Sequence, residues 1–239
     1  TYNQFWTQDL ANTILEELGT IDLVFSANCI CHIPDLDQTF SAVESVLSDN
    51  GFFVFEDPSL ASVINVNSYD QIYDEHPHVF SIIALKSILE RNNLSIVKVE
   101  NTSVHGGSNR VWVQKSKVAN PDSSVENNLT YERILGLDKS CTFDIFADRV
   151  LDSKEDLLRI LQRCADNNKK VISYGATSKS TTIFNYCGIG TDLISHITDT
   201  TPEKQNKFSP GVHIPIVAPD EHIDNSIEYA FLGAWNFEK

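Results

Sequence analysis

The feature that most constrains the fold is an alternation of short apolar strands with amphipathic helices near the start of the chain. Apolar side chains recur at helical spacing over residues 10–18, and residues 21–25 form a short apolar run typical of a buried strand. A second helix is predicted between Pro34 and residues 49–51, and residues 52–55 predict the next strand. Strands that alternate with helices in this way predict a parallel α/β sheet.

A pair of strands is predicted to follow this alternation. Ser81 is suited to cap a helix that ends near Arg91, and residues 94–99 and 111–114 have the apolar character of paired strands. The polar stretch 115–124 comes next and indicates a boundary between domains.

A second α/β pattern follows the polar stretch. Its predicted helices and strands are residues 144–150 and 154–165 (helical) and residues 170–174, 193–198 and 229–233 (strands). We therefore expect a first domain at residues 1–118, a linker and connecting helix at 119–150, and a second domain at 151–239.

The composition excludes several classes of protein. The net charge of -15 opposes nucleic-acid binding, which needs a basic surface. The 5 cysteines form no CxxC pair, and their odd number favours a reducing compartment, so we expect a cytoplasmic protein. Cys29 and Cys31 are interpreted as thiols that face the core near a strand end. No apolar stretch is long enough to span a membrane, and the start at Thr1 without methionine predicts a piece of a longer protein.

The run YDEHPH at residues 73–78 concentrates groups that move protons near neutral pH. The unperturbed pKa of His76 is about 6.5, so its neutral ring accepts a proton at physiological pH. Glu75 is suited to orient an imidazole or polarise a substrate hydroxyl, and Tyr73 to donate to an oxygen that gains charge. The same residues also fit a polar turn made rigid by Pro77.

A metal site is a second interpretation of this run. Glu75, His76 and His78, together with His32 or His105, have the side-chain types that bind zinc or iron(II). Their spacing is not that of a helical HExxH motif, so we predict no metal ligands in this chain.

Two further segments are candidates for the same site. His32 follows a predicted strand and precedes a helix, where site residues lie in doubly wound sheets. The alternative is a helix-start histidine held in a hydrogen bond. The run HGGSNR at residues 105–110 combines two glycines with His105, Ser108 and Arg110 as candidate ligand-binding residues. The alternative is a tight hairpin turn with an exposed arginine.

The run GATSKSTT at residues 175–182 opens a helix after a strand. Free amide groups and Lys179 at such a helix start are suited to hold phosphate. The run is neither a P-loop nor GxGxxG, and Thr177, Ser178 and Ser180 also fit a helix cap.

Six runs match one family in the expected order. They are ANCICHIPDL (27–36), QIYDEHPHVFS (71–81), HGGSNRVWV (105–113), YGATSKSTTIFNYCGIG (174–190), SPGVHIPI (209–216) and LGAWNF (232–237). The chain resembles the S-adenosylmethionine-dependent sugar C-methyltransferases, including enzymes that add a branch methyl at C3 of dTDP-4-keto-deoxysugars.

The resemblance implies a fold in three parts: an N-terminal zinc-binding region, a central class I methyltransferase domain and a C-terminal Rossmann-like domain. This chain is similar to the later half of the central domain and most of the C-terminal one. The glycine-rich cofactor loop is missing from it, and zinc is expected only in the missing N-terminal region. Asp74 departs from the family's YHEH pattern, and Ser180 replaces a glycine of its GAT-KG pattern.

The function that the resemblance implies is methyl transfer from S-adenosylmethionine to C3 of a nucleotide-linked 4-ketosugar, through an enolate. The alternatives are a nucleotide-sugar-binding module without methyl transfer and a metal-dependent hydrolase. This chain alone is expected to be inactive. The implied site residues are His76 as the base, Tyr73, Glu75 and His32 around the sugar, Ala27 and Asn28 at the cofactor, and His105, Ser108, Arg110 and Lys179 at the substrate.

Overall fold

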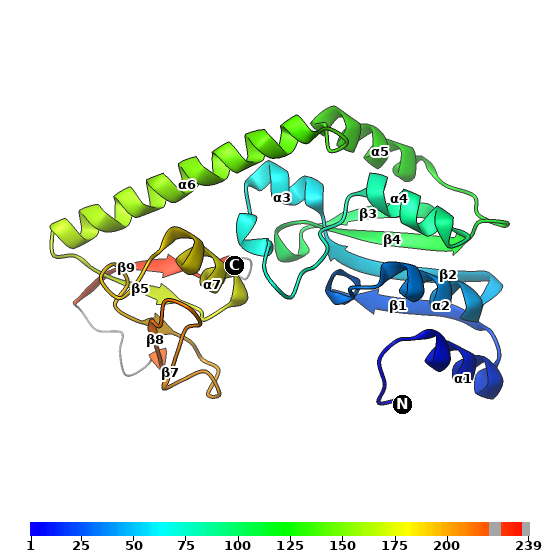
Figure 1. Ribbon diagram of the computed structural model, residues 1–239, viewed down its shortest axis with the longest axis horizontal. Helices are drawn as coiled ribbons and strands as arrows, with labels where there is room; N and C mark the ends of the chain where they lie inside the picture. The colour runs from blue at the N-terminus through cyan, green and yellow to red at the C-terminus, as the bar shows by residue number, and fades with distance from the viewer. Residues whose placement is uncertain (220–225, 236–239) are drawn as a thin grey trace. The chain divides into compact units, whose positions relative to one another are not determined.

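The computed structural model describes residues 1–219 and 226–235 (Figure 1). The chain divides into two compact units. Unit 1 comprises Thr1–Val66 and Asp74–Asp144, and unit 2 comprises Asn67–Tyr73 and Ile145–Lys239. Each unit contains one sheet with helices, so the predicted α/β fold class is confirmed.

The sheet of unit 1 has four strands in the order β1-β2-β4-β3. They are β1 (Ile21–Ala27), β2 (Leu47–Pro58), β3 (Leu94–Thr102) and β4 (Ser108–Lys115). Strand β1 pairs with β2 in parallel, whereas β2–β4 and β3–β4 are antiparallel. The predicted parallel start and the predicted strand pair are therefore both present.

The helices of unit 1 begin at capping residues that the sequence identifies. Ser81 accepts a hydrogen bond from the N–H of Ala84 and caps α4, as predicted. Asp35 caps α2 in the same way. The helices are α1 (Gln8–Leu18), α2 (Leu36–Val46), α3 (Leu60–Val66), α4 (Ile82–Arg91) and α5 (Ser123–Leu135). Helices α4 and α5 pack against β3 (Figure 1).

The core of unit 1 is aromatic at its centre. Phe40 of α2 lies 6.2 Å from Phe53 and 6.3 Å from Phe55 between ring centroids, and both partners belong to β2. All three rings are at most 1% exposed. Leu85 and Leu89 of α4 join the same cluster, so the helices that flank the sheet share one core.

The helix predicted to end at residues 49–51 ends earlier, at Val46. Leu47 pairs with Ile21 and is the first residue of β2, so pairing with β1 overrides the local helical pattern. A Cβ added at Gly51 would lie 2.9 Å from the carbonyl oxygen of Ile21, so this glycine allows close packing of the strands.

One other local prediction was wrong. Ser108 and Arg110 belong to β4 and not to a loop, because they pair with β2 and β3. Helix α5, capped by Asp122, lies in the segment predicted as a linker and connecting helix. The short 3₁₀ turns are η1 (Ile30–His32), η2 (Tyr69–Gln71) and η3 (Val104–Gly106).

The sheet of unit 2 has five strands in the order β7-β8-β6-β5-β9. They are β5 (Lys170–Tyr174), β6 (Ile197–Thr198), β7 (Lys207–Phe208), β8 (Pro215–Val217) and β9 (Ile227–Leu232). All pairs are parallel except β7–β8. The strand predicted at residues 193–198 is paired only over its last two residues.

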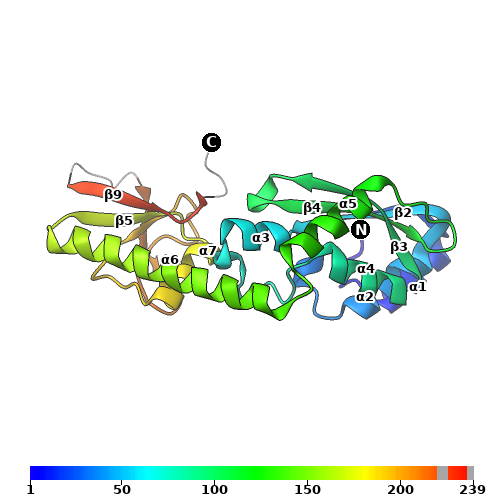
Figure 2. The same ribbon diagram turned by 90° about the horizontal axis from the view of Figure 1, so that it is seen from above.

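Two helices cover this sheet. Helix α6 (Ser140–Asp166) runs alongside β5 in unit 2 and contributes Leu161 to its core (Figure 2). Helix α7 (Ser178–Cys187) follows β5 and contributes the fully buried Phe184. The end of the run LGAWNF, residues 236–237, lies outside the described residues. Within residues 1–219 and 226–235, no helix has the length and apolarity needed to cross a membrane.

Candidate active site

A side-chain amide oxygen without a hydrogen-bond partner lies at the carboxyl end of β1. Ala27 is the exposed last residue of the strand, and Asn28 follows it with a φ of 50°. The backbone N–H of Asn28 donates to the carbonyl oxygen of Glu56, 2.7 Å away, which fixes this turn to β2. The side-chain oxygen Oδ1 of Asn28 is buried and has no hydrogen-bond partner. A buried acceptor without a partner is costly in free energy, so this position is suited to accept from a ligand.

The turn η1 carries a buried thiol against a buried carboxylate. Cys31 is 1% exposed and Asp57 is 2% exposed. The backbone N–H of Cys31 donates to Oδ1 of Asp57 over 3.3 Å. Burial raises the pKa of the Cys31 thiol, and the neighbouring Asp57 adds to the effect.

The environment of Asp57 combines opposing effects on its pKa. Burial raises the pKa of the Asp57 carboxyl, whereas hydrogen bonds from Cys31 and the nearby His32 oppose that shift. The second oxygen, Oδ2, is buried without a hydrogen-bond partner.

His32 is held by the backbone of the YDEHPH run. Its Nδ1 lies 2.5 Å from the carbonyl oxygen of Glu75. Because a carbonyl oxygen only accepts, Nδ1 carries the hydrogen, and the lone pair of the neutral ring is on Nε2. The ring centroids of His32 and His76 lie 4.7 Å apart, with planes inclined at 60°. The two imidazoles therefore face one region at the carboxyl edge of the sheet.

His78 fastens the other end of the run. Its Nε2 donates to the carbonyl oxygen of Pro34 over 3.2 Å, and its backbone N–H donates to that of Cys31 over 3.4 Å. Its ring stacks on Phe80, a core residue. The segment that carries Glu75 and His76 is thereby attached to the turn that carries His32.

Arg110 is engaged inside the sheet. Its Nη2 and Nε lie 2.8 Å and 3.0 Å from Oε2 of Glu56, its cross-strand partner. The Glu56 side chain is 7% exposed and that of Arg110 42%. One edge of the guanidinium therefore neutralises a buried carboxylate, while the rest of the group reaches solvent.

The other residues of the HGGSNR run hold the β3–β4 turn. His105 has a left-handed φ of 54°, and Ser108 is 1% exposed and donates to the carbonyl oxygen of Val104. A Cβ added at Gly107 would lie 2.3 Å from Oγ of Ser62 in α3. This glycine therefore allows close packing on a helix, whereas the sequence alone suggested close approach to a ligand.

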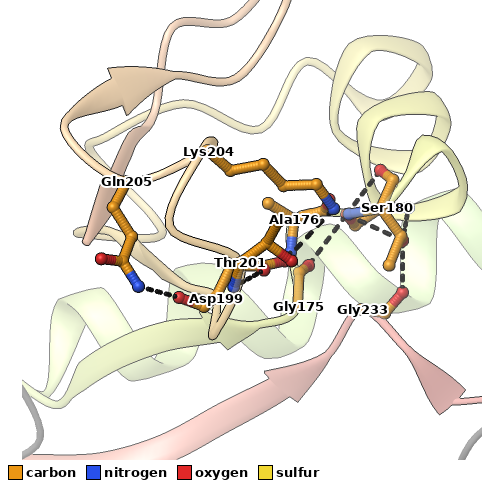
Figure 3. Close-up of polar contacts among 9 residues, drawn as sticks. Gly175, Ala176, Ser180, Asp199, Thr201, Lys204, Gln205 and Gly233 are labelled. Atoms are coloured by element: carbon orange, nitrogen blue, oxygen red, sulfur yellow. Dashed lines mark hydrogen bonds and ion pairs between the residues drawn. The ribbon is translucent and has the colours of Figure 1, made fainter. Parts of the chain in front are cut away.

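In unit 2, the loop between β5 and α7 is closed by its own hydrogen bonds (Figure 3). The N–H groups of Gly175 and Ala176 donate to Thr198 O and to Oδ2 of Asp199, each over 2.8 Å. Thr177 and Ser180 form a reciprocal capping box. The backbone N–H groups of Gly175, Ala176, Thr177 and Ser180 therefore all donate hydrogen bonds within the protein. The helix-cap interpretation is confirmed for Thr177 and Ser180.

Lys204 completes this arrangement from the neighbouring loop. Its Nζ donates to the carbonyl oxygen of Ala176 over 2.8 Å and lies 3.5 Å from Oδ2 of Asp199, as Figure 3 shows. Asp199 also accepts from the N–H of Thr201 over 2.8 Å. The loop therefore offers few of the free amides on which the phosphate hypothesis depended.

Lys179 and Tyr73 lie together in unit 2. Nζ of Lys179 is 6.0 Å from the centroid of the Tyr73 ring, within reach of a cation–π contact. Nearby, the buried Asp70 accepts from Nε1 of Trp235 over 2.6 Å. Burial raises the pKa of Asp70, and the Trp235 hydrogen bond and the charge of Lys179 oppose that shift.

Unit 1 thus brings together His32, Glu75 and His76, whereas Tyr73 and Lys179 belong to unit 2. Sequence reasoning did not identify Asp57 as a site residue, nor the contact of Cys31 with it. A signal was present for Asp57, because it lies near the carboxyl end of a predicted strand, where site residues of α/β sheets gather.

Two solved structures have partial similarity to the chain. An S-adenosylmethionine-dependent methyltransferase from Anabaena variabilis is 11% identical with a TM-score of 0.36, covering 46% of this chain and 55% of that one. The magnesium protoporphyrin IX methyltransferase ChlM from Synechocystis is 16% identical with a TM-score of 0.32, covering 41% and 47%.

Sequence comparisons cover nearly the whole chain. The C-methyltransferase NovU of Streptomyces niveus is 31% identical over 233 residues, which is 97% of this chain and 56% of NovU. The chain thus spans about half the length of this curated relative. A general methyltransferase domain model matches residues 2–99, and a C-methyltransferase C-terminal domain model matches residues 103–239. These matches confirm the predicted resemblance, and the chain belongs to the C-methyltransferase family.

Proposed function

We propose that the enzyme to which this chain belongs transfers a methyl group from S-adenosylmethionine to C3 of a nucleotide-linked 4-ketosugar. The observation that carries the proposal is the approach of His32 and His76, with ring centroids 4.7 Å apart near the carboxyl end of β1. Family membership supports methylation at carbon, and NovU is the relative whose name specifies that chemistry.

A carbon beside a ketone is methylated after it loses a proton. The carbonyl group acidifies the C3 hydrogen, since removal of that proton leaves an enolate whose negative charge rests largely on oxygen. His76 is the proposed base, because its ring is half-buried and has the residue type whose neutral form accepts a proton near pH 7. The C3–H electron pair would enter the enolate as His76 takes the proton, and the nucleophilic C3 would take the methyl group as the methyl–sulfur bond breaks, leaving its electron pair on sulfur as a neutral thioether.

His32 is the proposed partner of that base. Its hydrogen bond to the Glu75 carbonyl fixes the ring orientation and leaves Nε2 to interact with the substrate. Glu75 is exposed and is proposed to contact the sugar through its carboxylate. Tyr73 is proposed to donate to the developing enolate oxygen.

The proposed place of the cofactor is the end of β1. The orphaned Oδ1 of Asn28 would accept a hydrogen bond from a donor of S-adenosylmethionine, and the exposed Ala27 would line the same position. When bound, S-adenosylmethionine supplies an electrophilic methyl group. The residues of this chain orient the partners and move the proton.

The remaining predicted substrate residues have unequal support. Arg110 keeps part of its guanidinium in solvent, and His105 lies in the turn η3 that precedes β4, whereas Ser108 is buried and bonded to Val104. Lys179 is the proposed phosphate contact through its side chain. The nucleotide-linked sugar itself is inferred from the family resemblance.

The test compares two histidine variants of the full-length enzyme. His76→Asn should lower methyl transfer by about 10²–10⁴, the usual contribution of a positioned base, while calorimetry shows unchanged binding of S-adenosylmethionine. His78→Gln is the matched control, since glutamine replaces the Nε2 donor that bonds Pro34. A His76→Asn enzyme that keeps most of its rate would show that the base is another group.

A further inference from the structure

Three metal-ligating side chains converge beside β1 and β2 in unit 1. The ligand atoms of Cys31, His32 and His76 all lie within 4.8 Å of one another. We propose that these three residues bind a divalent transition-metal ion of the zinc type, and that this ion inhibits the enzyme. The proposal starts from their juxtaposition, because one thiolate and two imidazoles form a common set of zinc ligands.

A hydrogen bond to the backbone holds His32 in the tautomer that can bind such an ion. Histidine ligands of metals usually donate their other ring N–H to a carbonyl or carboxylate, which fixes the tautomer. The Nδ1 of His32 donates to the carbonyl of Glu75 over 2.5 Å, so Nε2 carries the lone pair. Binding of an ion at Nε2 therefore requires no change of tautomer at His32.

Cys31 forms the buried floor of the proposed site. It is 1% exposed, whereas His32 is exposed and His76 half-buried, so an ion would enter from the imidazole side. On binding, the S–H bond breaks, a sulfur–metal bond forms, and the proton leaves to solvent.

The ligand set selects a class of metal. A thiolate with two imidazoles suits Zn²⁺ or Co²⁺, whereas Mg²⁺ and Ca²⁺ prefer oxygen ligands. Three protein ligands leave the fourth tetrahedral position for water. The expected site therefore discriminates against magnesium and calcium at equal concentration.

The inhibitory consequence rests on the proposed function, whereas binding of the ion does not. A metal bound to the His76 ring occupies a nitrogen that the proposed base needs for the C3 proton. Cys31 touches no substrate in that mechanism, so the thiol is the group that separates metal binding from proton transfer.

Cobalt binding to this chain tests the site directly. Co²⁺ bound to a thiolate gives a charge-transfer absorption in the near ultraviolet, and we expect this band together with tetrahedral visible bands. Cys31→Ser should abolish the band and weaken binding at least about tenfold, the lower end of the effect of even outer-shell changes. Cys29→Ser is the matched control, because Cys29 is exposed and lies two positions away.

The histidines provide an independent readout. His76→Asn should also weaken Co²⁺ binding at least about tenfold, whereas His78→Gln should not change it. Circular dichroism establishes whether each variant is folded. If Cys31→Ser is unfolded, the result for His76→Asn decides, because His76 is only half-buried and its replacement disturbs the core less. The proposal is overturned if the unchanged chain gives no thiolate–cobalt band, if Cys29→Ser removes it, or if His76→Asn binds Co²⁺ normally.

Activity of the full-length enzyme separates the two proposals. Added Zn²⁺ should inhibit methyl transfer, and dialysis against buffer without added metal should restore it. If Co²⁺ binds as expected but His76→Asn methylates at the normal rate, the metal site stands and the assignment of the base fails. If Zn²⁺ binds to Cys31 without inhibiting, the inhibitory role is wrong.

Discussion

The Nδ1 of His32 and the carbonyl oxygen of Glu75 are 43 positions apart in the chain and 2.5 Å apart in the structure. This hydrogen bond joins the turn after β1 to the segment that carries His76. The orientation of one imidazole is therefore set by the backbone beside the other, which links the two halves of the proposed site.

Two substitutions at His32 test which of its nitrogens matters. Asparagine reproduces a donor near the position of Nδ1, whereas glutamine places its amide near Nε2. Because the proposal places Nε2 at the substrate, His32→Asn should lower kcat about tenfold, equivalent to about 1.4 kcal/mol, and His32→Gln should lower it less. Steady-state methyl transfer gives kcat and KM for both. The reverse order would assign the main role to the hydrogen bond between Nδ1 and the Glu75 carbonyl.

Removing Arg110 should destabilise unit 1. Its guanidinium neutralises the Glu56 carboxylate, whose side chain is 7% exposed, so Arg110→Ala leaves a buried charge without its partner. We expect a loss of about 1–3 kcal/mol in the free energy of unfolding, measured by urea denaturation. Adding Glu56→Gln to this variant should recover part of the loss.

The control for Arg110 is an exposed ion pair. Arg91 and Asp37 form a salt bridge with side chains 60% and 59% exposed, so solvent screens the pair and Arg91→Ala should change stability far less than Arg110→Ala does. Equal losses for Arg91→Ala and Arg110→Ala would mean that burial of Glu56 does not set the effect.

Local signals in the sequence predicted the elements that are stabilised locally. Ser81 caps α4 and Thr177 caps α7, because a capping side chain bonds to an N–H within its own helix. The start of β2 at Leu47 was not predicted, because it depends on pairing with Ile21, which is distant in sequence. Helix α5 was missed because its few buried side chains make a weak periodic pattern.

The candidate site also has a part that local sequence signals predict and a part that depends on tertiary packing. The polar residues after β1 and in the YDEHPH run are recognisable from residue type and from their place at strand ends. The contact of Cys31 with Asp57 and its proximity to His76 arise from tertiary packing, which no spacing encodes. The roles of His76, Tyr73 and Glu75 in catalysis stay predictions.

Stability should depend on pH through Glu132 of α5. This carboxylate is 1% exposed and accepts the N–H groups of Ile82 and Ile83 over 2.8 Å and 2.9 Å. Burial raises its pKa, although the two hydrogen bonds oppose the shift. Since the folded pKa lies above the unfolded one, the folded state binds more protons between them. The contribution of Glu132 is therefore most favourable below about pH 4.3, the unfolded pKa, and is lost as pH rises through the folded pKa.

Urea denaturation of Glu132→Gln at pH 4 and pH 7 measures this dependence. The difference in unfolding free energy between the unchanged chain and the variant should be larger at about pH 4 than at about pH 7. Glu126→Gln is the control on the same helix, since that side chain is 70% exposed and its effect should be small at both values. A Glu132→Gln penalty that grows with pH would show that the hydrogen bonds outweigh burial.

Asp199 should stabilise unit 2 with the opposite pH dependence. Burial alone would raise the pKa of this carboxyl, but hydrogen bonds from Thr201 and Ala176 and the charge of Lys204 outweigh it and lower the pKa. The stabilisation is therefore present above about pH 3.9, the unfolded pKa, and is lost as pH falls through the folded pKa. In Asp199→Asn, the side-chain NH₂ of asparagine would face one of the two backbone N–H groups that the carboxylate now accepts from. We expect this variant to lose about 1–3 kcal/mol of unfolding free energy at neutral pH.

The exposed Asp192 supplies the matched control for Asp199. Asp192→Asn should leave unfolding in urea almost unchanged, because its carboxylate lies in solvent. The penalty of Asp199→Asn should shrink as the solution is acidified, since protonation removes the charge from the unchanged chain as well. A penalty that stays constant down to low pH would mean that Asp199 stabilises the β5–α7 loop by shape and not by its charge, and that the loop amides are satisfied equally well by a neutral acceptor.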